Sequence, residues 1–138
     1  MRAFRLTILC LLAMLPALLN AAAPAKEEAN PLGFEYVPLA PNLVVSFGEE
    51  ARMGFLRVEV SIRVASAAAE ALKHHMPAIR HELIMLFSRQ SAESLAAPKR
   101  EELRVAALEA VRKLLAEAGK VPPEEIQDLM FPSFMIQR

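Results

Sequence analysis

Three histidines, His74, His75 and His81, are the side chains best suited to hold a metal ion, because neutral imidazole is a common zinc ligand. A site would also need a carboxylate such as that of Glu70 to converge with two or three of them. Pro77 lies between His75 and His81 and breaks the helical phase, so the spacing does not fix these rings on one face. No HExxH motif or pair of histidines four residues apart occurs. The sequence therefore predicts exposed histidines at a helix junction, with no metal and no cofactor.

No other pattern of residues indicates catalysis. None of the serines lies in a G-x-S-x-G turn, and the isolated glycines cannot form a phosphate-binding loop. Paired glutamates fall in expected linkers, turns and helix starts, where they favour solubility and compensate helix dipoles. The only cysteine, Cys10, lies in an apolar run, so the rest of the chain has neither a thiol nucleophile nor a disulfide. We expect a protein that is not an enzyme.

The charge also narrows the class of partner. Residues 1–25 contain Arg2 and Arg5 and no acidic residue, so the remaining chain carries 14 basic and 16 acidic side chains. A net charge of about −2 lacks the basic footprint of proteins that bind nucleic acid. We therefore expect no nucleic-acid partner.

The first 25 residues form an export or membrane-anchoring segment. Two arginines precede an uncharged run from Leu6 to Leu19, and a small-residue stretch follows before Lys26. The large apolar residues of this run are Leu6, Ile8, Leu9, Leu11, Leu12, Met14, Leu15, Leu18 and Leu19. A basic start, an apolar stretch and an A-x-A-like exit describe a cleaved signal peptide, whereas 20 uncharged residues are also long enough to span a bilayer. Both alternatives stay open from the residues alone, and both deliver the following domain across the membrane.

Residues 26–41 contain several prolines, which is typical of an extended linker. The domain proper is predicted over residues 42–138. Asn42 to Phe47 indicates a strand, and Gly48 to Gly54 a hairpin connection. Residues 55–65 alternate strictly between apolar and polar side chains, which predicts an antiparallel strand with one buried and one wet face.

Helices are expected over residues 67–75, 77–89 and 99–118. Ser66 is predicted to cap the first, Pro77 to begin the second, and Gly119 to end the third in a left-handed conformation. Residues 124–138 predict a last strand that is apolar on both faces and therefore more buried than the strand before it. Pro132 within this strand must face an edge or a bulge, because it has no N–H to donate. The predicted fold class is α+β, a small antiparallel sheet formed by a hairpin and a C-terminal strand, packed with two to three helices and preceded by an N-terminal hydrophobic helix.

Four segments in this order resemble the flagellar basal body-associated protein FliL family over residues 36–138. The segment YVPLAPNLVVSF contains the proline and the family's V-N-L-like stretch, here Asn42, Leu43 and Val44. FLRVEVSIRV and IRHELIMLFSRQSAESL are similar to its second strand and to a helix that ends in a serine-rich turn. The closing MFPSFMIQR is similar to its F-x-x-F-x-x-Q pattern, here Phe131, Phe134 and Gln137.

The resemblance implies a fold similar to the stomatin-type SPFH domain and a single-pass protein of the inner membrane with its domain in the periplasm. It further implies association with the basal body and the MotA/MotB stator, homo-oligomers, support of rotation in motility and chemotaxis, and no catalytic residue. The short N-terminus departs from the family's longer cytoplasmic tail. A soluble periplasmic binding or accessory module with a cleaved N-terminus and the same fold is the alternative.

Overall fold

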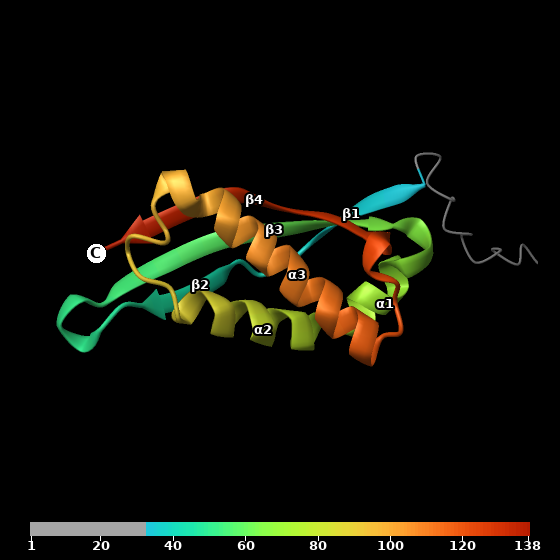
Figure 1. Ribbon diagram of the computed structural model, residues 1–138, viewed down its shortest axis with the longest axis horizontal. Coiled ribbons are helices and arrows are strands. Elements are labelled where there is room, and N and C mark those ends of the chain that lie inside the picture. Colours follow the sequence, from blue (N-terminus) through green and yellow to red (C-terminus); the bar gives the residue numbers. More distant parts are fainter. Residues whose placement is uncertain (1–32) are drawn as a thin grey trace, which may run out of the picture.

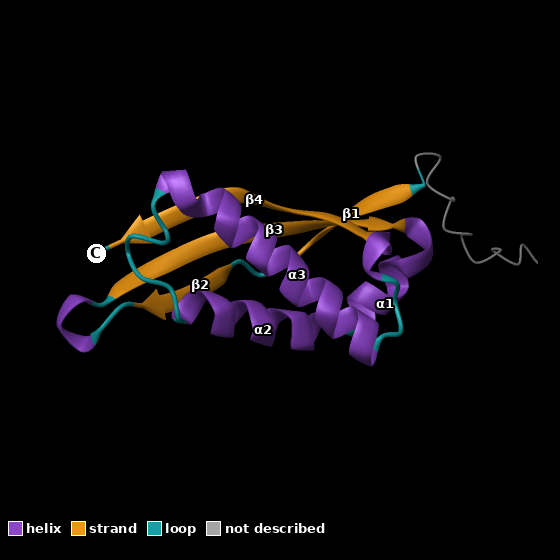
Figure 2. Ribbon diagram, in the orientation of Figure 1, coloured by secondary structure: helices purple, strands orange, loops and turns teal. Residues whose placement is uncertain are grey.

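The computed structural model describes residues 33–138, so the expectations for the export segment and for residues 26–32 lie outside the described chain. These residues form an α+β domain in which two long helices cover one face of an antiparallel sheet (Figures 1 and 2). The strands are β1 (Phe34–Pro38), β2 (Leu43–Phe47), β3 (Gly54–Ala65) and β4 (Ile126–Gln137). The helices are α1 (Ala69–His74), α2 (Met76–Ser88) and α3 (Arg100–Ala118). The predicted α+β class, with its small antiparallel sheet and three helices, is confirmed.

Strand β3 is the centre of the sheet, because it pairs with all three other strands. β2 pairs with its first half, with Leu43 opposite Val58, and completes the predicted hairpin. β1 pairs with its second half along the same edge, and β4 runs antiparallel along the opposite edge. The strict alternation over residues 55–65 therefore belongs to a strand with neighbours on both sides.

The linker expected over residues 26–41 is wrong for its second half. Residues 34–38 are strand β1, with Tyr36 opposite Arg63 and Pro38 opposite Ser61. The hydrogen bonds continue one residue further, where the Leu39 N–H donates to Val60 O at 2.9 Å. The prolines indicated a linker, but they interrupt an edge of the sheet, where a missing donor is tolerated.

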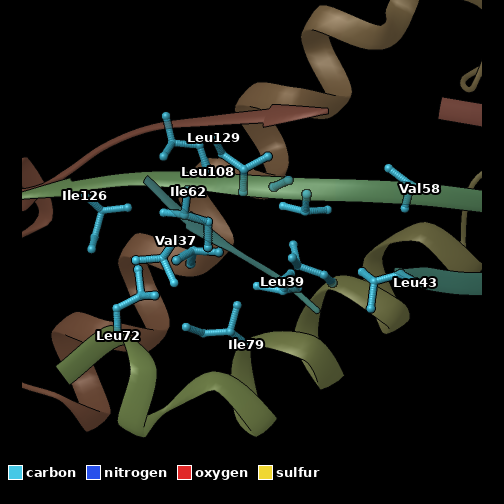
Figure 3. Close-up of a cluster of buried hydrophobic side chains, with 14 of the residues drawn as sticks. Val37, Leu39, Leu43, Val58, Ile62, Leu72, Ile79, Leu108, Ile126 and Leu129 are labelled. Carbon is cyan, nitrogen blue, oxygen red and sulfur yellow. The ribbon is translucent and has the colours of Figure 1, made fainter. Parts of the chain in front are cut away.

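The core is a single apolar cluster between the sheet and the helices (Figure 3). The even-numbered residues of β3 from Leu56 to Val64 are fully buried, and they belong to one cluster with Ile79, Leu83 and Phe87 of α2. The buried residues of α3 are Leu103, Ala107, Leu108, Val111 and Leu115. Helical periodicity predicts a stripe of Leu103, Ala107, Val111 and Leu114 flanked by Leu108 and Leu115, and of these only Leu114 is partly buried. Among residues 33–138 no polar or charged residue is fully buried.

Strand β4 is less buried than β3, which contradicts the prediction that it would be the more buried of the two. It lies at the edge of the sheet and pairs with β3 alone among the described strands. A β-bulge interrupts its register, because Ser133 faces Glu59 and Met130 faces Ser61. Phe131 and Pro132 thus stand opposite Val60 alone, so of the two positions predicted for this proline, an edge or a bulge, the register shows a bulge.

The bulge also changes which residues of β4 share a face. An unbroken period of two predicts Leu129 and Phe131 on one side with Ser133 and Met135, and Phe134 on the other. The extra residue reverses the alternation, so Leu129, Phe131 and Phe134 all pack against the core. An unbroken period of two holds only for a strand without a bulge.

Two helix ends differ from the predictions. The Ser66 hydroxyl caps nothing; a short 3-10 turn, Ser66–Ala68, leads into α1, and the Ser66 Oγ is buried without a hydrogen-bond partner. Gly119 has φ −95°, and the left-handed residue after α3 is Lys120, with φ 54°. A Cβ at Gly119 would lie 3.2 Å from the His75 ring, so the glycine allows this close approach and not a turn of the backbone.

Candidate interaction surface

The face of the sheet opposite α2 and α3, which we call the open face, collects exposed apolar side chains from all four strands. Register places Tyr36, Val44, Phe55 and Met135 on this face, and each is between 49% and 63% exposed. They form half of the large apolar side chains that stand out as exposed within residues 33–138. Apolar groups gathered on one surface are typical of an interaction site, whereas scattered ones are ordinary.

Two arginines stand among these apolar side chains. Arg57 lies on β3 between Val44 of β2 and Met135 of β4, because both residues are its register partners. Arg63 lies six residues further along β3, beside Tyr36. Glu59, opposite Ser133, is between them. The open face therefore carries apolar residues on both sides of Arg57 and an aromatic residue on one side of Arg63, which has Asp128 of β4 as its other register partner.

Arg63 is held in place by an aromatic ring. Its guanidinium carbon lies 3.9 Å from the centroid of the Phe34 ring, which is a cation–π contact. The Phe34 ring meets that of Tyr36 edge to face, with centroids 5.6 Å apart. This part of the open face is thus a packed surface, and its side chains lose little freedom when a partner covers them.

The residues that carried the family resemblance have two different roles. Leu43 is buried in the core, and Asn42 is half-buried before β2. Phe131 and Phe134 are half-buried, and Phe131 meets Phe87 of α2 edge to face at 5.8 Å. Only Val44 and Gln137 point to the exposed side, at opposite edges of β3. Most of the motif therefore builds the core and does not form a site.

Arg104 of α3 fastens the long helix to β4. Its guanidinium donates to Asp128 and Leu129 O of β4 and to both carboxylate oxygens of Glu101, one turn earlier on α3. The hydrogen bond from Arg104 lowers the pKa of the Glu101 carboxyl below its ordinary value of 4.5. The carboxylates of Glu101 and Asp128 therefore have a structural role: they pair with the arginine that holds α3 against β4.

The histidines considered as metal ligands do not assemble a site with carboxylates. His74 and His75 meet edge to face with ring centroids 5.0 Å apart, and His81 is exposed on α2. Nowhere in residues 33–138 do three His, Cys, Asp or Glu side chains come together in a group that could hold a metal ion. Within the same residues no helix has both the length and the apolarity to cross a membrane.

The sequence indicated only part of this surface. The alternation of β3 identified Arg57, Glu59 and Arg63 as a wet strand face, but the apolar residues around them come from other strands. Tyr36 was missed because β1 was taken for a linker, and Met135 because the faces of the last strand were assigned with an unbroken period of two. The missing information is the register, which one sequence does not supply.

The fold and this surface define a class: a small α+β domain with a helix-covered face, a core and an open sheet face suited to a macromolecular partner. The family model described as "Flagellar basal body-associated protein FliL" matches residues 36–137, nearly the whole described chain. The chain belongs to the FliL family, and its family role is association with the flagellar basal body. The comparison with curated proteins finds no match.

Proposed function

We propose that this protein is a non-enzymatic component of the flagellar motor that contacts the stator and supports rotation in motility and chemotaxis. Membership of the FliL family supports the basal body as its location. The observation that carries the finer proposal is the open face, where apolar side chains of four strands remain uncovered on a folded domain. A surface of this kind fits a MotA/MotB-like partner or a second copy in a homo-oligomer, since protein interfaces have apolar and aromatic centres.

The placement beside the motor rests on the N-terminal segment. We propose that residues 1–25 are retained as a single-pass anchor in the inner membrane, with the domain in the periplasm. Seven residues lie between Ala25 and Gly33, so the eight steps from one to the other reach at most about 28 Å. Such a tether would hold the domain, for which we also propose an SPFH-like fold, close to the membrane. Intact-mass analysis of the membrane fraction would distinguish this anchor from the cleaved, periplasmic alternative.

The test compares two double variants in a strain that lacks the chromosomal gene. Val44→Ser with Phe55→Ser removes apolar surface from the open face, and Ile84→Ser with Val105→Ser removes exposed apolar side chains from the helices instead. Swarm diameter, swimming speed and reversal frequency are the readouts, with the protein level measured by immunoblot. We expect the open-face pair to lower motility and crosslinking to the stator, and the helix pair to leave both unchanged.

Two results would count against the proposal. Normal swarming and reversal in the deletion strain would remove the motor role altogether. Normal motility of the open-face pair, at a normal protein level, would show that this surface has no partner in the motor.

A further inference from the structure

Three segments far apart in the sequence meet at the end of the sheet remote from β1 (Figure 1). They are the β2–β3 hairpin, the loop that follows α2, and the end of β4 (Figures 1 and 2). A hollow of about 340 Å³ lies between them, at the lower end of the size range of ligand pockets. Its lining residues are Phe47, Arg52, Met53, Ala92 and Arg138.

The hairpin gives this hollow a defined shape. Gly48 has φ +90°, and a Cβ there would lie 2.8 Å from Arg52 O, so only glycine allows the loop to fold back so tightly. The Arg52 N–H then donates to Glu49 O at 2.8 Å. Gly54 leaves room for the Phe47 ring, because a Cβ on it would be 2.6 Å from the Phe47 Cζ. The result is an aromatic floor beneath a fixed turn.

The charged side chains of the lining are of one sign. Arg52 and Arg138 are its only charged side chains, and neither forms an ion pair within residues 33–138. Arg104 and Arg112 of α3, in contrast, each pair with a glutamate three residues earlier. The apolar walls come from Met53, which is 53% exposed, and Ala92. Two unpaired guanidinium groups beside an apolar floor are complementary to a carboxylate carried on an apolar body.

We propose that this hollow binds a short segment of a protein partner in which a carboxylate side chain follows an apolar one. The carboxylate lies between Arg52 and Arg138, and the apolar side chain lies against Phe47 and Met53. This site is at the end of the sheet and is separate from the open face. The proposal that it binds such a segment does not depend on the proposed motor role. Strand β1, where the described chain begins, lies at the other end of the domain from this hollow (Figure 1).

The test uses the full chain in phosphatidylcholine nanodiscs and a fluorescein-labelled peptide of alternating leucine and glutamate. A peptide with glutamine in place of glutamate measures the contribution of the charge. Fluorescence polarisation gives the affinity for wild type, Arg52→Gln, Arg138→Gln and the control Arg89→Gln, an exposed arginine outside the lining. Circular dichroism of each variant establishes that the domain is folded.

We expect the acidic peptide to bind at least tenfold more tightly than the glutamine peptide, and more weakly as salt rises. Arg52→Gln and Arg138→Gln should each weaken it at least fivefold, whereas Arg89→Gln should leave it unchanged. Equal binding of both peptides, or equal losses in all three variants, would overturn the proposal. So would binding to phosphatidylglycerol vesicles that depends on Arg52 while the peptide does not bind, since the ligand would then be a lipid surface.

Discussion

Phe131 and Phe134 are three residues apart in one strand and yet share its core-facing side, with ring centroids 5.6 Å apart. In a regular strand an odd spacing places two side chains on opposite faces. The bulge at Pro132 adds one residue between them and restores a common face. Arg100 of α3 then lies over the Phe134 ring at 4.5 Å. The spacing of the F-x-x-F pattern is therefore explained by the bulge and by packing.

Deletion of Pro132 is the first prediction. Without the extra residue, Phe131 alone stands opposite Val60, so Phe131 and Phe134 become two residues apart and keep their common core-facing side. We therefore expect the deletion to lower the free energy of unfolding by no more than about 1 kcal/mol. An alanine inserted after Pro132 should instead turn Phe134 and Ile136 to the open face and cost about 3–5 kcal/mol, because two apolar side chains lose their packing. Urea unfolding followed by circular dichroism measures both variants, and equal midpoints would contradict this account of the bulge.

Substitutions at the neighbouring residues Leu43 and Val44 of the family motif should have very different effects on the free energy of unfolding. Leu43 is 1% exposed in the core, and Val44 is 63% exposed on the open face. Leu43→Ala should cost about 2–5 kcal/mol in the free energy of unfolding, since it leaves a cavity. Val44→Ala should change it by no more than about 0.5 kcal/mol. Thermal and urea unfolding check both; a large loss for Val44→Ala would mean that its contacts differ from those described.

The elements read correctly from the sequence are those whose pattern is local and regular. Strand β3 and the helices α2 and α3 follow an unbroken period, so each pattern alone predicted the buried face. Strand β1 was missed because five residues beside prolines carry no such period. The faces of β4 were assigned wrongly because the bulge arises from pairing with β3.

The interaction surface was harder to predict than the fold. Tyr36, Val44 and Met135 belong to three different strands, and only their pairing with β3 brings them onto one face. The hollow at the hairpin end likewise joins Arg52 with Arg138, which no motif connects. Surfaces of this kind depend on register and on the meeting of distant segments, and periodicity contains neither.

The residue after Gly119 gives the third prediction. Lys120 has φ 54°, in the left-handed region that costs a residue with a Cβ about 1–2 kcal/mol. Lys120→Gly removes this strain and should raise the free energy of unfolding by about 1 kcal/mol. Lys120→Ala keeps the Cβ and removes the same charge, so it should show no such gain. Urea unfolding of both variants checks this, and an equal change in the two would show that the charge, not the backbone, sets the stability here.

Acid sensitivity of the link between Glu101 and Arg104 is the last prediction. Arg104 lowers the pKa of Glu101 in the folded protein, while the unfolded chain has the ordinary value of 4.5. The unfolded state therefore takes up a proton first as the pH falls, so the stability contributed by this pair is present above pH 4.5 and is lost below it. Glu101→Gln should thus be less stable than wild type near neutral pH, and the difference should shrink as the pH falls through the folded pKa.

The matched control for this effect is Glu102→Gln. Glu102 is exposed in the same first turn of α3, close to the same helix dipole, and forms no ion pair within residues 33–138. The difference in the free energy of unfolding between Glu102→Gln and wild type should therefore contain no contribution from a contact with Arg104. Urea unfolding of the three proteins at several pH values from neutral to about pH 3 gives the comparison. If the stability of Glu101→Gln and Glu102→Gln varied with pH in the same way, the dipole of α3 would account for the effect and the contact with Arg104 would not.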